Sequence, residues 1–175
     1  ALAADPPGGR ELAHFDFGAA LRAAAAGEAG RAGLANAEIE AVRDVLERAA
    51  LFEDGQWPIA AKLLRAFLDD RPAAAILLNG LPRHVDQAED MDELVDVRTV
   101  IELRCDAATV LTRLRLDPAG DRAERRDDGL REIRQKLRTY AQRTTPLVEH
   151  YRARGARTIG VETGPTDAAA ELLEK

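Results

Sequence analysis

Hydrophobic residues in this chain fall into two patterns, short continuous runs and longer stretches in which they recur every three or four positions. The run at 73–78 is continuously apolar and bounded by Pro72 and Gly80, which is typical of a strand buried on both faces of a parallel sheet. Four runs predict strands, at residues 12–17, 73–78, 99–104 and 157–162. Because helical stretches separate them, we expect right-handed crossovers and an α/β fold with a parallel sheet.

The longer stretches predict helices between these strands. Residues 19–68 are Ala-rich and carry apolar residues at helical spacing, with interruptions at 35–36 and 53–55, so they predict a set of short helices. Further helices are predicted at 87–94 and behind Asp106, which is a good N-cap. One face of a later helix carries the apolar residues Leu130, Ile133, Leu137, Tyr140 and Ala141. The dipeptide Thr145-Pro146 should break or kink that helix.

Composition narrows the class of protein. With 46% hydrophobic and 32% charged residues in 175, the chain is expected to be a soluble globular domain, and no apolar run approaches the ~20 residues of a membrane helix. A net charge of −6 argues against a general nucleic-acid surface. The single cysteine, Cys105, excludes an internal disulfide, so we expect a reducing cytoplasm.

Candidate chemistry begins where the second predicted strand ends. The run 73–78 is followed by Gly80, Pro82 and Arg83. Open α/β sheets bind ligands at the carboxyl ends of their strands, so Arg83 is placed to hold an anion. The alternative is a strand-to-helix turn whose arginine is merely solvated.

Two motifs resemble those of adenylate kinases and related nucleoside monophosphate kinases. The sequence NGLPRHVDQAE resembles the signature DGFPRTxxQAE, and RRDDGLREIRQKLRTYAQRTTPLVEHY is similar to RxDDxxExIxxRLxxYxxxTxPLxxYY. This resemblance implies that Arg83 holds the phosphate of the acceptor monophosphate and that Gln87 hydrogen-bonds its adenine.

Further site residues follow from the same resemblance. The segment LAHFDFGAALR resembles hISTGDLLR, which makes Arg22 the second arginine on the acceptor phosphate. Arg113 corresponds to an arginine of the donor-nucleotide site, and Arg125 would project toward the transferred phosphate. Lys136 stands where the family has a phosphate-contacting arginine. A lysine keeps the positive charge but lacks the planar guanidinium that donates two parallel hydrogen bonds. Arg83, Arg113 and Arg125 are thus the candidate catalytic residues, with Arg22, Arg83, Gln87 and Lys136 for substrate binding.

The resemblance also implies an architecture. It predicts one P-loop kinase-like domain over residues 1–175, with a three-layer parallel sheet covered by helices on both faces. Residues 19–68 would form the acceptor-binding insert and 115–126 a short lid, which has no cysteine pair for zinc. The chain contains no Gly-Lys dipeptide, which a P-loop requires. We therefore expect the P-loop and the central strand upstream of residue 1.

The implied activity is transfer of a phosphoryl group from ATP to a nucleoside monophosphate, with AMP as the first candidate. Mg²⁺ is implied by the reaction rather than by a visible ligand set, and a cytoplasmic monomer without nucleic-acid or membrane partners is expected. Phe17, Ala19 and Asn79 depart from the family pattern. Two alternatives therefore stay open: a non-catalytic nucleotide-binding protein that acts as a sensor or interaction module, and a kinase of another small acceptor.

Overall fold

The computed structural model describes residues 12–48, 52, 54–72, 74–116 and 130–167. The chain divides into two compact units, Leu2–Leu94 and Val95–Lys175. Each unit contains one two-stranded sheet, and the strands of both sheets are parallel. The prediction of parallel pairing is therefore confirmed within each unit.

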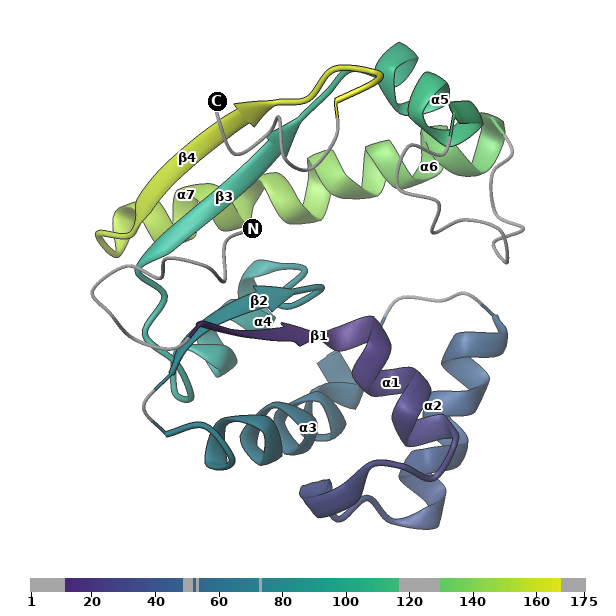
Figure 1. Ribbon diagram of the computed structural model, residues 1–175, viewed down its shortest axis with the longest axis vertical. Helices are drawn as coiled ribbons and strands as arrows, with labels where there is room; N and C mark the ends of the chain where they lie inside the picture. The colour runs from purple at the N-terminus through teal and green to yellow at the C-terminus, as the bar shows by residue number, and fades with distance from the viewer. Residues whose placement is uncertain (1–11, 49–51, 53, 73, 117–129, 168–175) are drawn as a thin grey trace. The chain divides into compact units, whose positions relative to one another are not determined.

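The Leu2–Leu94 unit is built from two strands and a set of helices. Its elements in chain order are β1 (Leu12–Asp16), α1 (Phe17–Ala25), the 3₁₀ helix η3 (Gly30–Ala32), α2 (Asn36–Glu47), the 3₁₀ helix η4 (Asp54–Gln56), α3 (Trp57–Asp69), β2 (Ala75–Asn79) and α4 (Val85–Met91). Strands β1 and β2 lie side by side with α3 running alongside them (Figure 1). The set of short helices predicted for 19–68 is present.

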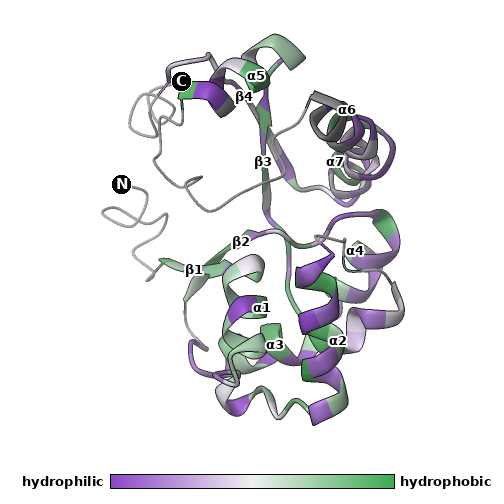
Figure 2. Ribbon diagram, turned by 90° about the vertical axis from the view of Figure 1, so that its right-hand side faces the viewer, coloured by the Kyte–Doolittle hydropathy of each residue, from purple (hydrophilic) through white to green (hydrophobic). Residues whose placement is uncertain are grey.

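The core of this unit lies between β1 and the helices. Phe15 of β1 is buried and meets Phe67 of α3 edge to face, with ring centroids 5.1 Å apart. Helix α3 adds the buried residues Ile59, Ala60, Ala61, Leu63 and Leu64. Figure 2 shows hydrophobic residues on β1 and on α3 accordingly. Burial of this apolar stripe stabilises the helix against the sheet, as its periodicity predicts.

The Val95–Lys175 unit contains β3 (Thr99–Arg104), α5 (Ala107–Leu116), α6 (Leu130–Thr139), the π-helix η5 (Tyr140–Thr144), α7 (Thr145–Ala153) and β4 (Arg157–Glu162). The bounds of β3 and β4 agree with the predicted strands. Helix α7 packs against both strands and buries Leu147, Val148 and Tyr151 (Figure 1). Helices α6, η5 and α7 follow one another without a gap, so the chain is not broken at Thr145-Pro146. Pro146 lies in the first turn of α7, directly after the wider π turns of Tyr140–Thr144.

The predicted bounds of two strands and one helix need correction, and a polar cap explains one of these differences. The second strand covers Ala75–Asn79 instead of 73–78. The first strand ends at Asp16 rather than at residue 17, because the Asp16 side chain accepts a hydrogen bond from the Ala19 amide and thereby starts α1 at Phe17. Helix α4 covers Val85–Met91 instead of 87–94. Asp106 does cap α5, since its Oδ1 accepts from the Thr109 amide at 2.7 Å.

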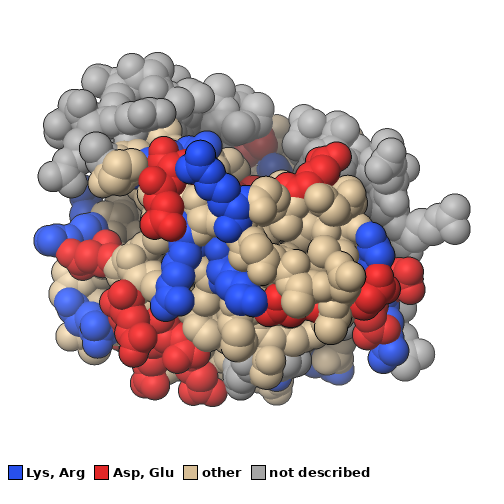
Figure 3. All heavy atoms as spheres, turned by 90° about the horizontal axis from the view of Figure 1, so that it is seen from below, with Lys and Arg blue, Asp and Glu red and all other residues tan. Residues whose placement is uncertain are grey.

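Charged residues of both signs are interspersed on the face of the molecule in Figure 3. Within the part of the chain that the structure describes, no helix is both long enough and apolar enough to cross a membrane.

Candidate functional site

The carboxyl ends of β1 and β2 bring two polar side chains together. Asp16 and Asn79 are partners in the parallel register, each at the last position of its strand. The Asn79 Nδ2 donates a hydrogen bond to Asp16 Oδ2 at 3.1 Å, while Asp16 Oδ1 accepts from the Ala19 amide at 2.8 Å. One carboxylate thus joins the two strand ends and caps helix α1.

The surroundings of Asp16 favour its ionised form. The hydrogen bond from the Ala19 amide lowers the pKa of this carboxyl most, and the Asn79 amide and the nearby Arg22 and His14 charges add to the effect against the opposing effect of burial. A negative charge is therefore fixed at the strand ends at neutral pH.

Replacing Asp16 tests both roles of this side chain. We expect Asp16→Ala to lower the free energy of unfolding by about 1 kcal/mol, the usual loss of an N-cap. Asp16→Asn keeps an oxygen for the Ala19 amide and should fall between wild type and Asp16→Ala at pH 7. Because the folded pKa is depressed, the advantage of wild type over Asp16→Asn should shrink as pH falls below about 4. Urea titrations between pH 7 and pH 2 measure this, and a gap that stays constant with pH would contradict the charge effect.

Arg83 follows β2 after a tight turn at Gly80. Gly80 has φ +86°, and a Cβ at this position would lie 3.2 Å from Phe17 Cβ, so glycine fits both the backbone and the space. The Arg83 Nε donates to the Gly80 carbonyl at 3.0 Å, which folds the guanidinium back toward the strand end. Burial lowers the pKa of Arg83, although the group stays charged at neutral pH.

Arg22 reaches the same strand ends from helix α1. A Cβ placed on Gly18 would lie 3.4 Å from Arg22 Nη1 and 3.3 Å from Asp16 Oδ1, so the guanidinium lies beside the first turn of its own helix. Arg22 is exposed, whereas Arg83 is half-buried. The structure therefore places Arg22 on the helix that follows β1 and Arg83 after the turn that follows β2, and ligands bind at this edge of the sheet in this fold class.

Gln87 lies inside the protein instead of facing solvent. Its side chain is 1% exposed, its Oε1 accepts a hydrogen bond from the Arg83 amide, and its Nε2 donates to the Phe52 carbonyl, both at 3.1 Å. Both polar ends of the amide are thus used within the protein. A contact between Gln87 and an adenine base stays a prediction.

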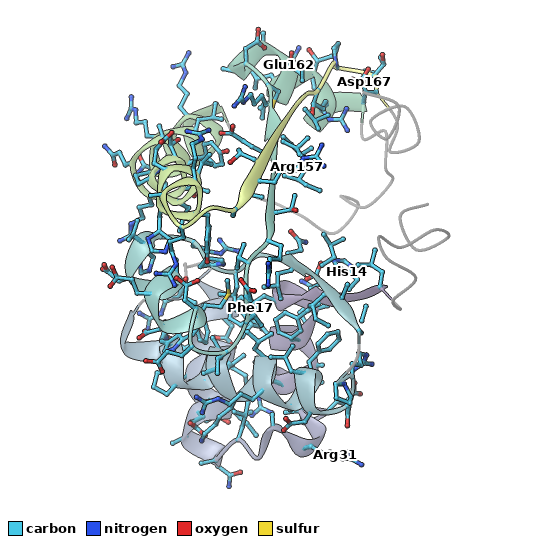
Figure 4. The ribbon with its side chains drawn as sticks, turned by 90° about the vertical axis from the view of Figure 1, so that its left-hand side faces the viewer. His14, Phe17, Arg31, Arg157, Glu162 and Asp167 are labelled. Carbon is cyan, nitrogen blue, oxygen red and sulfur yellow. The ribbon has the colours of Figure 1, made fainter. Side chains whose placement is uncertain are left out.

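Phe17, one of the departures from the family pattern, is a core residue. It is 1% exposed, and its ring meets Phe52 edge to face at a centroid distance of 5.3 Å. Figure 4 shows Phe17 inside the Leu2–Leu94 unit, whereas Arg31 lies at the periphery of that unit. The phenyl ring at this position therefore packs against other aromatic rings.

Arg113, the predicted donor-site residue, is held in the Val95–Lys175 unit by main-chain oxygens. Its Nη1 donates to the carbonyls of Gly164 and Asp167, each at 2.9 Å, and the Gly164 amide donates to Asp167 Oδ2 at 2.7 Å. These bonds connect helix α5 to the segment that follows β4, near the labelled Asp167 in Figure 4. Arg125 lies outside the described residues, and of Lys136 only the main chain, within α6, is described.

Comparison with known proteins identifies the family. No family model matches the chain. An adenylate kinase of Synechococcus sp. (strain RCC307) is 32% identical over 169 residues, which cover 93% of this chain and 82% of the relative. An adenylate kinase of Synechococcus sp. (strain CC9311) is 33% identical over 135 residues, which cover 74% of this chain and 69% of the relative. The chain belongs to the adenylate kinase family.

Membership of the adenylate kinase family confirms the resemblance found in the motifs. It supports a nucleoside monophosphate kinase function, with the nucleotide binding that this function entails, and it fits an α/β fold of the P-loop kinase type. An adenylate kinase of Thermobifida fusca (strain YX) is 34% identical over 111 residues, covering 59% of this chain and 56% of the relative.

Two groups that bond to residues of the site, the Asp16 carboxylate and the Phe52 carbonyl, were not among the predicted site residues. Asp16 could have been found, because an Asp directly before a helical stretch is a common N-cap. The Phe52 carbonyl could not have been found, because a main-chain oxygen carries no sequence signal.

Proposed function

We propose that this member of the adenylate kinase family transfers a phosphoryl group from ATP to a nucleoside monophosphate, with AMP as the acceptor. The observation that carries this proposal is the half-buried guanidinium of Arg83 beyond the carboxyl end of β2, with Arg22 of α1 beside Asp16 at the end of the neighbouring strand. Two arginines at one sheet edge suit an anion that presents several oxygens, as a phosphate monoester does.

The roles of the residues follow from what phosphoryl transfer requires. The reaction needs in-line positioning of its two substrates and positive charge around the phosphoryl oxygens, and little covalent help from the protein. Arg22 and Arg83 would fix the acceptor phosphate. Because Arg83 has already lost hydration through burial, a phosphate would replace that hydration with charge-assisted hydrogen bonds. Arg113 and Arg125 would neutralise the transferred group, and Lys136 would add a point charge.

Adenylate kinases generally use Mg²⁺ with ATP, and the residues present are compatible with that ion. The described residues contain no cluster of three or more His, Cys, Asp or Glu that could hold a metal by itself. Magnesium bound with a nucleotide needs no such cluster, because phosphates and waters supply most of its ligands beside one or two carboxylates. Asp16, with Asn79 beside it, would hold a water of that ion. When bound, Mg²⁺ neutralises charge on the phosphates of ATP.

A second candidate function is favoured by Asn79. The family signature has Asp at this position, and an amide orders a magnesium water shell less strongly than a carboxylate. A protein that binds a nucleotide without turnover, as a sensor or interaction module, would keep Arg22 and Arg83 and tolerate this change.

Three expectations about the architecture stay predictions. They are the three-layer arrangement, the single domain with insert and lid, and the monomeric state.

An assay of ADP formation by the full-length protein separates the candidates. With ATP, AMP and Mg²⁺ we expect turnover that disappears when AMP or Mg²⁺ is left out. Absence of turnover under these conditions would reject the kinase, and calorimetry with AMP would then separate a nucleotide binder from a protein that binds none. Turnover with another small acceptor in place of AMP would support the proposed kinase activity and would correct the proposed substrate.

A further inference from the structure

The carboxylate of Asp16 lies next to two positions at which the family motifs carry aspartate. The sequence NGLPRHVDQAE has Asn79 where the signature DGFPRTxxQAE begins with Asp, and LAHFDFGAALR has Ala19 where hISTGDLLR has Asp. This chain therefore lacks both of those carboxylates. In exchange, the motif hISTGDLLR has Ser where this chain has Asp16, so one carboxylate is gained at the same sheet edge.

The gained carboxylate contacts both of the positions that lost one. Its Oδ1 accepts from the main-chain amide of Ala19 at 2.8 Å, and its Oδ2 accepts from Asn79 Nδ2 at 3.1 Å. Asp16 and Asn79 are also partners in the parallel register, as the last residues of β1 and β2. A single negative charge thus lies against the main chain of one motif position and against the side chain of the other.

The Asp16 carboxylate keeps acceptor sites beside these two bonds. A carboxylate offers about four lone pairs, and the two bonds use one on each oxygen. Asp16 is half-buried and Asn79 is exposed, so water reaches this strand end. Gly18 leaves the space beside the carboxylate open, because a Cβ there would lie 3.3 Å from Asp16 Oδ1. Asp16 can therefore accept hydrogen bonds from a hydrated ion while it caps α1.

A hydrated divalent cation that enters with nucleotide phosphates suits such an acceptor. Magnesium keeps several of its waters and uses one or two carboxylates beside the substrate phosphates. These waters donate hydrogen bonds, and an ionised carboxylate accepts them more strongly than a neutral amide does. Asn79 donates through its nitrogen to Asp16, which leaves only the neutral Asn79 Oδ1 as an acceptor. Asp16 therefore supplies the charged acceptor of this pair.

We propose that Asp16 orders the water shell of the Mg²⁺ that binds with the nucleotide, in place of the aspartate that the family signature has at Asn79. The carboxylate stands at the end of β1 instead of β2 and acts across the same register pair. Asn79 then serves to hold Asp16 in place, so an asparagine at this position is compatible with turnover. The inference rests on the proposed function, in which the metal enters with ATP.

Three variants test this exchange of positions. Asp16→Asn removes the charge and keeps an oxygen for the Ala19 amide, and Asp16→Ser keeps a good N-cap with the residue of the family motif. The double variant Asp16→Ser, Asn79→Asp returns the carboxylate to the end of β2. Glu28→Gln removes one negative charge from an exposed residue beyond the other end of α1 and is the matched control.

Metal binding is measured with Mn²⁺, which takes the same oxygen ligands as Mg²⁺ and whose free form is detected by electron paramagnetic resonance. The full-length protein is supplied with AMP and the non-hydrolysable ATP analogue adenylyl imidodiphosphate, so that no turnover occurs. Asp16→Asn and Asp16→Ser should weaken Mn²⁺ binding about tenfold, the scale for loss of an outer-shell partner, and the double variant should regain most of that loss. Glu28→Gln should match wild type. Unchanged Mn²⁺ affinity in both single variants, or a double variant as weak as Asp16→Ser, would overturn the proposal.

Calorimetry with AMP in the presence of EDTA separates a metal role from a structural one. Without metal, loss of the Asp16 charge near Arg22 should leave the affinity for AMP unchanged or raise it, because AMP is itself an anion. A structural role alone would give a different result. If AMP binding in EDTA weakens by the same factor as Mn²⁺ binding, Asp16 acts only by holding the strand ends, and the proposal is overturned.

An assay of ADP formation on the same samples distinguishes the metal role of Asp16 from the proposed function. If Mn²⁺ binding depends on Asp16 but wild type forms no ADP from ATP and AMP, the proposed function fails and the role of Asp16 stands. If ADP forms while Mn²⁺ affinity does not depend on Asp16, the function stands and the role of Asp16 fails. Wild type that binds no Mn²⁺ with both nucleotides present would also overturn the role of Asp16.

Discussion

Replacing Arg83 by Ala is expected to lower kcat/KM for AMP by about 10³-fold, the scale on which arginines stabilise transferring phosphates. The guanidinium is half-buried at the end of β2, so an acceptor phosphate gains both its charge and its donors there. The free energy of unfolding should fall by only about 1 kcal/mol, the contribution of a single hydrogen bond such as the one to the Gly80 carbonyl. Steady-state kinetics and urea unfolding measure the two effects.

Two further variants control this experiment. Arg83→Lys keeps a positive charge without the planar fork, so its loss should be intermediate between wild type and Arg83→Ala. Arg65→Ala removes an exposed arginine of α3 and should leave kcat/KM unchanged. Wild-type kinetics in a folded Arg83→Ala protein would mean that Arg83 does not hold the acceptor.

Phe17→Ala is expected to lower the free energy of unfolding by about 3–5 kcal/mol, the usual cost of truncating a fully buried phenylalanine. The ring is 1% exposed and packs against Phe52, so its removal leaves a cavity in the core of the Leu2–Leu94 unit. Urea unfolding followed by circular dichroism measures the change. Phe17→Leu should cost much less, because it fills most of the same volume.

The same variants separate a core residue from a ligand contact. The family pattern has Thr where this chain has Phe17, which raised the possibility of altered base choice. If Phe17 acts only in packing, Phe17→Leu should keep the AMP affinity of wild type. A loss of AMP affinity at unchanged stability would contradict the core role.

Much of the fold follows from hydrophobic patterning. The bounds of β3 and β4 could be predicted because each is a short segment with several β-branched residues, and the cap at Asp106 follows from its place ahead of a helical stretch. The hydrophobic pattern places the end of the first strand at Phe17, one residue too late. In the structure Asp16 caps α1, and the strand ends there. In that case a local hydrogen bond overrides the hydrophobic pattern.

Some features of the candidate site could be predicted from the sequence, and others could not because they depend on local hydrogen bonds. The placement of Arg22 and Arg83 beyond the same sheet edge could be predicted, because parallel strands end on the same side of a sheet. The burial of Gln87 could not, since its partners are a main-chain amide and a main-chain carbonyl. The bonds of Arg113 to the carbonyls of Gly164 and Asp167 escaped prediction for the same reason.

The parallel pairing of both sheets also determines the order in which each unit can fold. Strands β1 and β2 are separated by residues 17–74, and β3 and β4 by residues 105–156, so neither pair can start as a hairpin. Helices such as α1, α2 and α3 rest on local contacts and can begin to form early, whereas each strand ladder requires the closure of a long loop. We therefore expect the sheet edge that carries Asp16 and Asn79 to be completed late in refolding, when β1 and β2 pair.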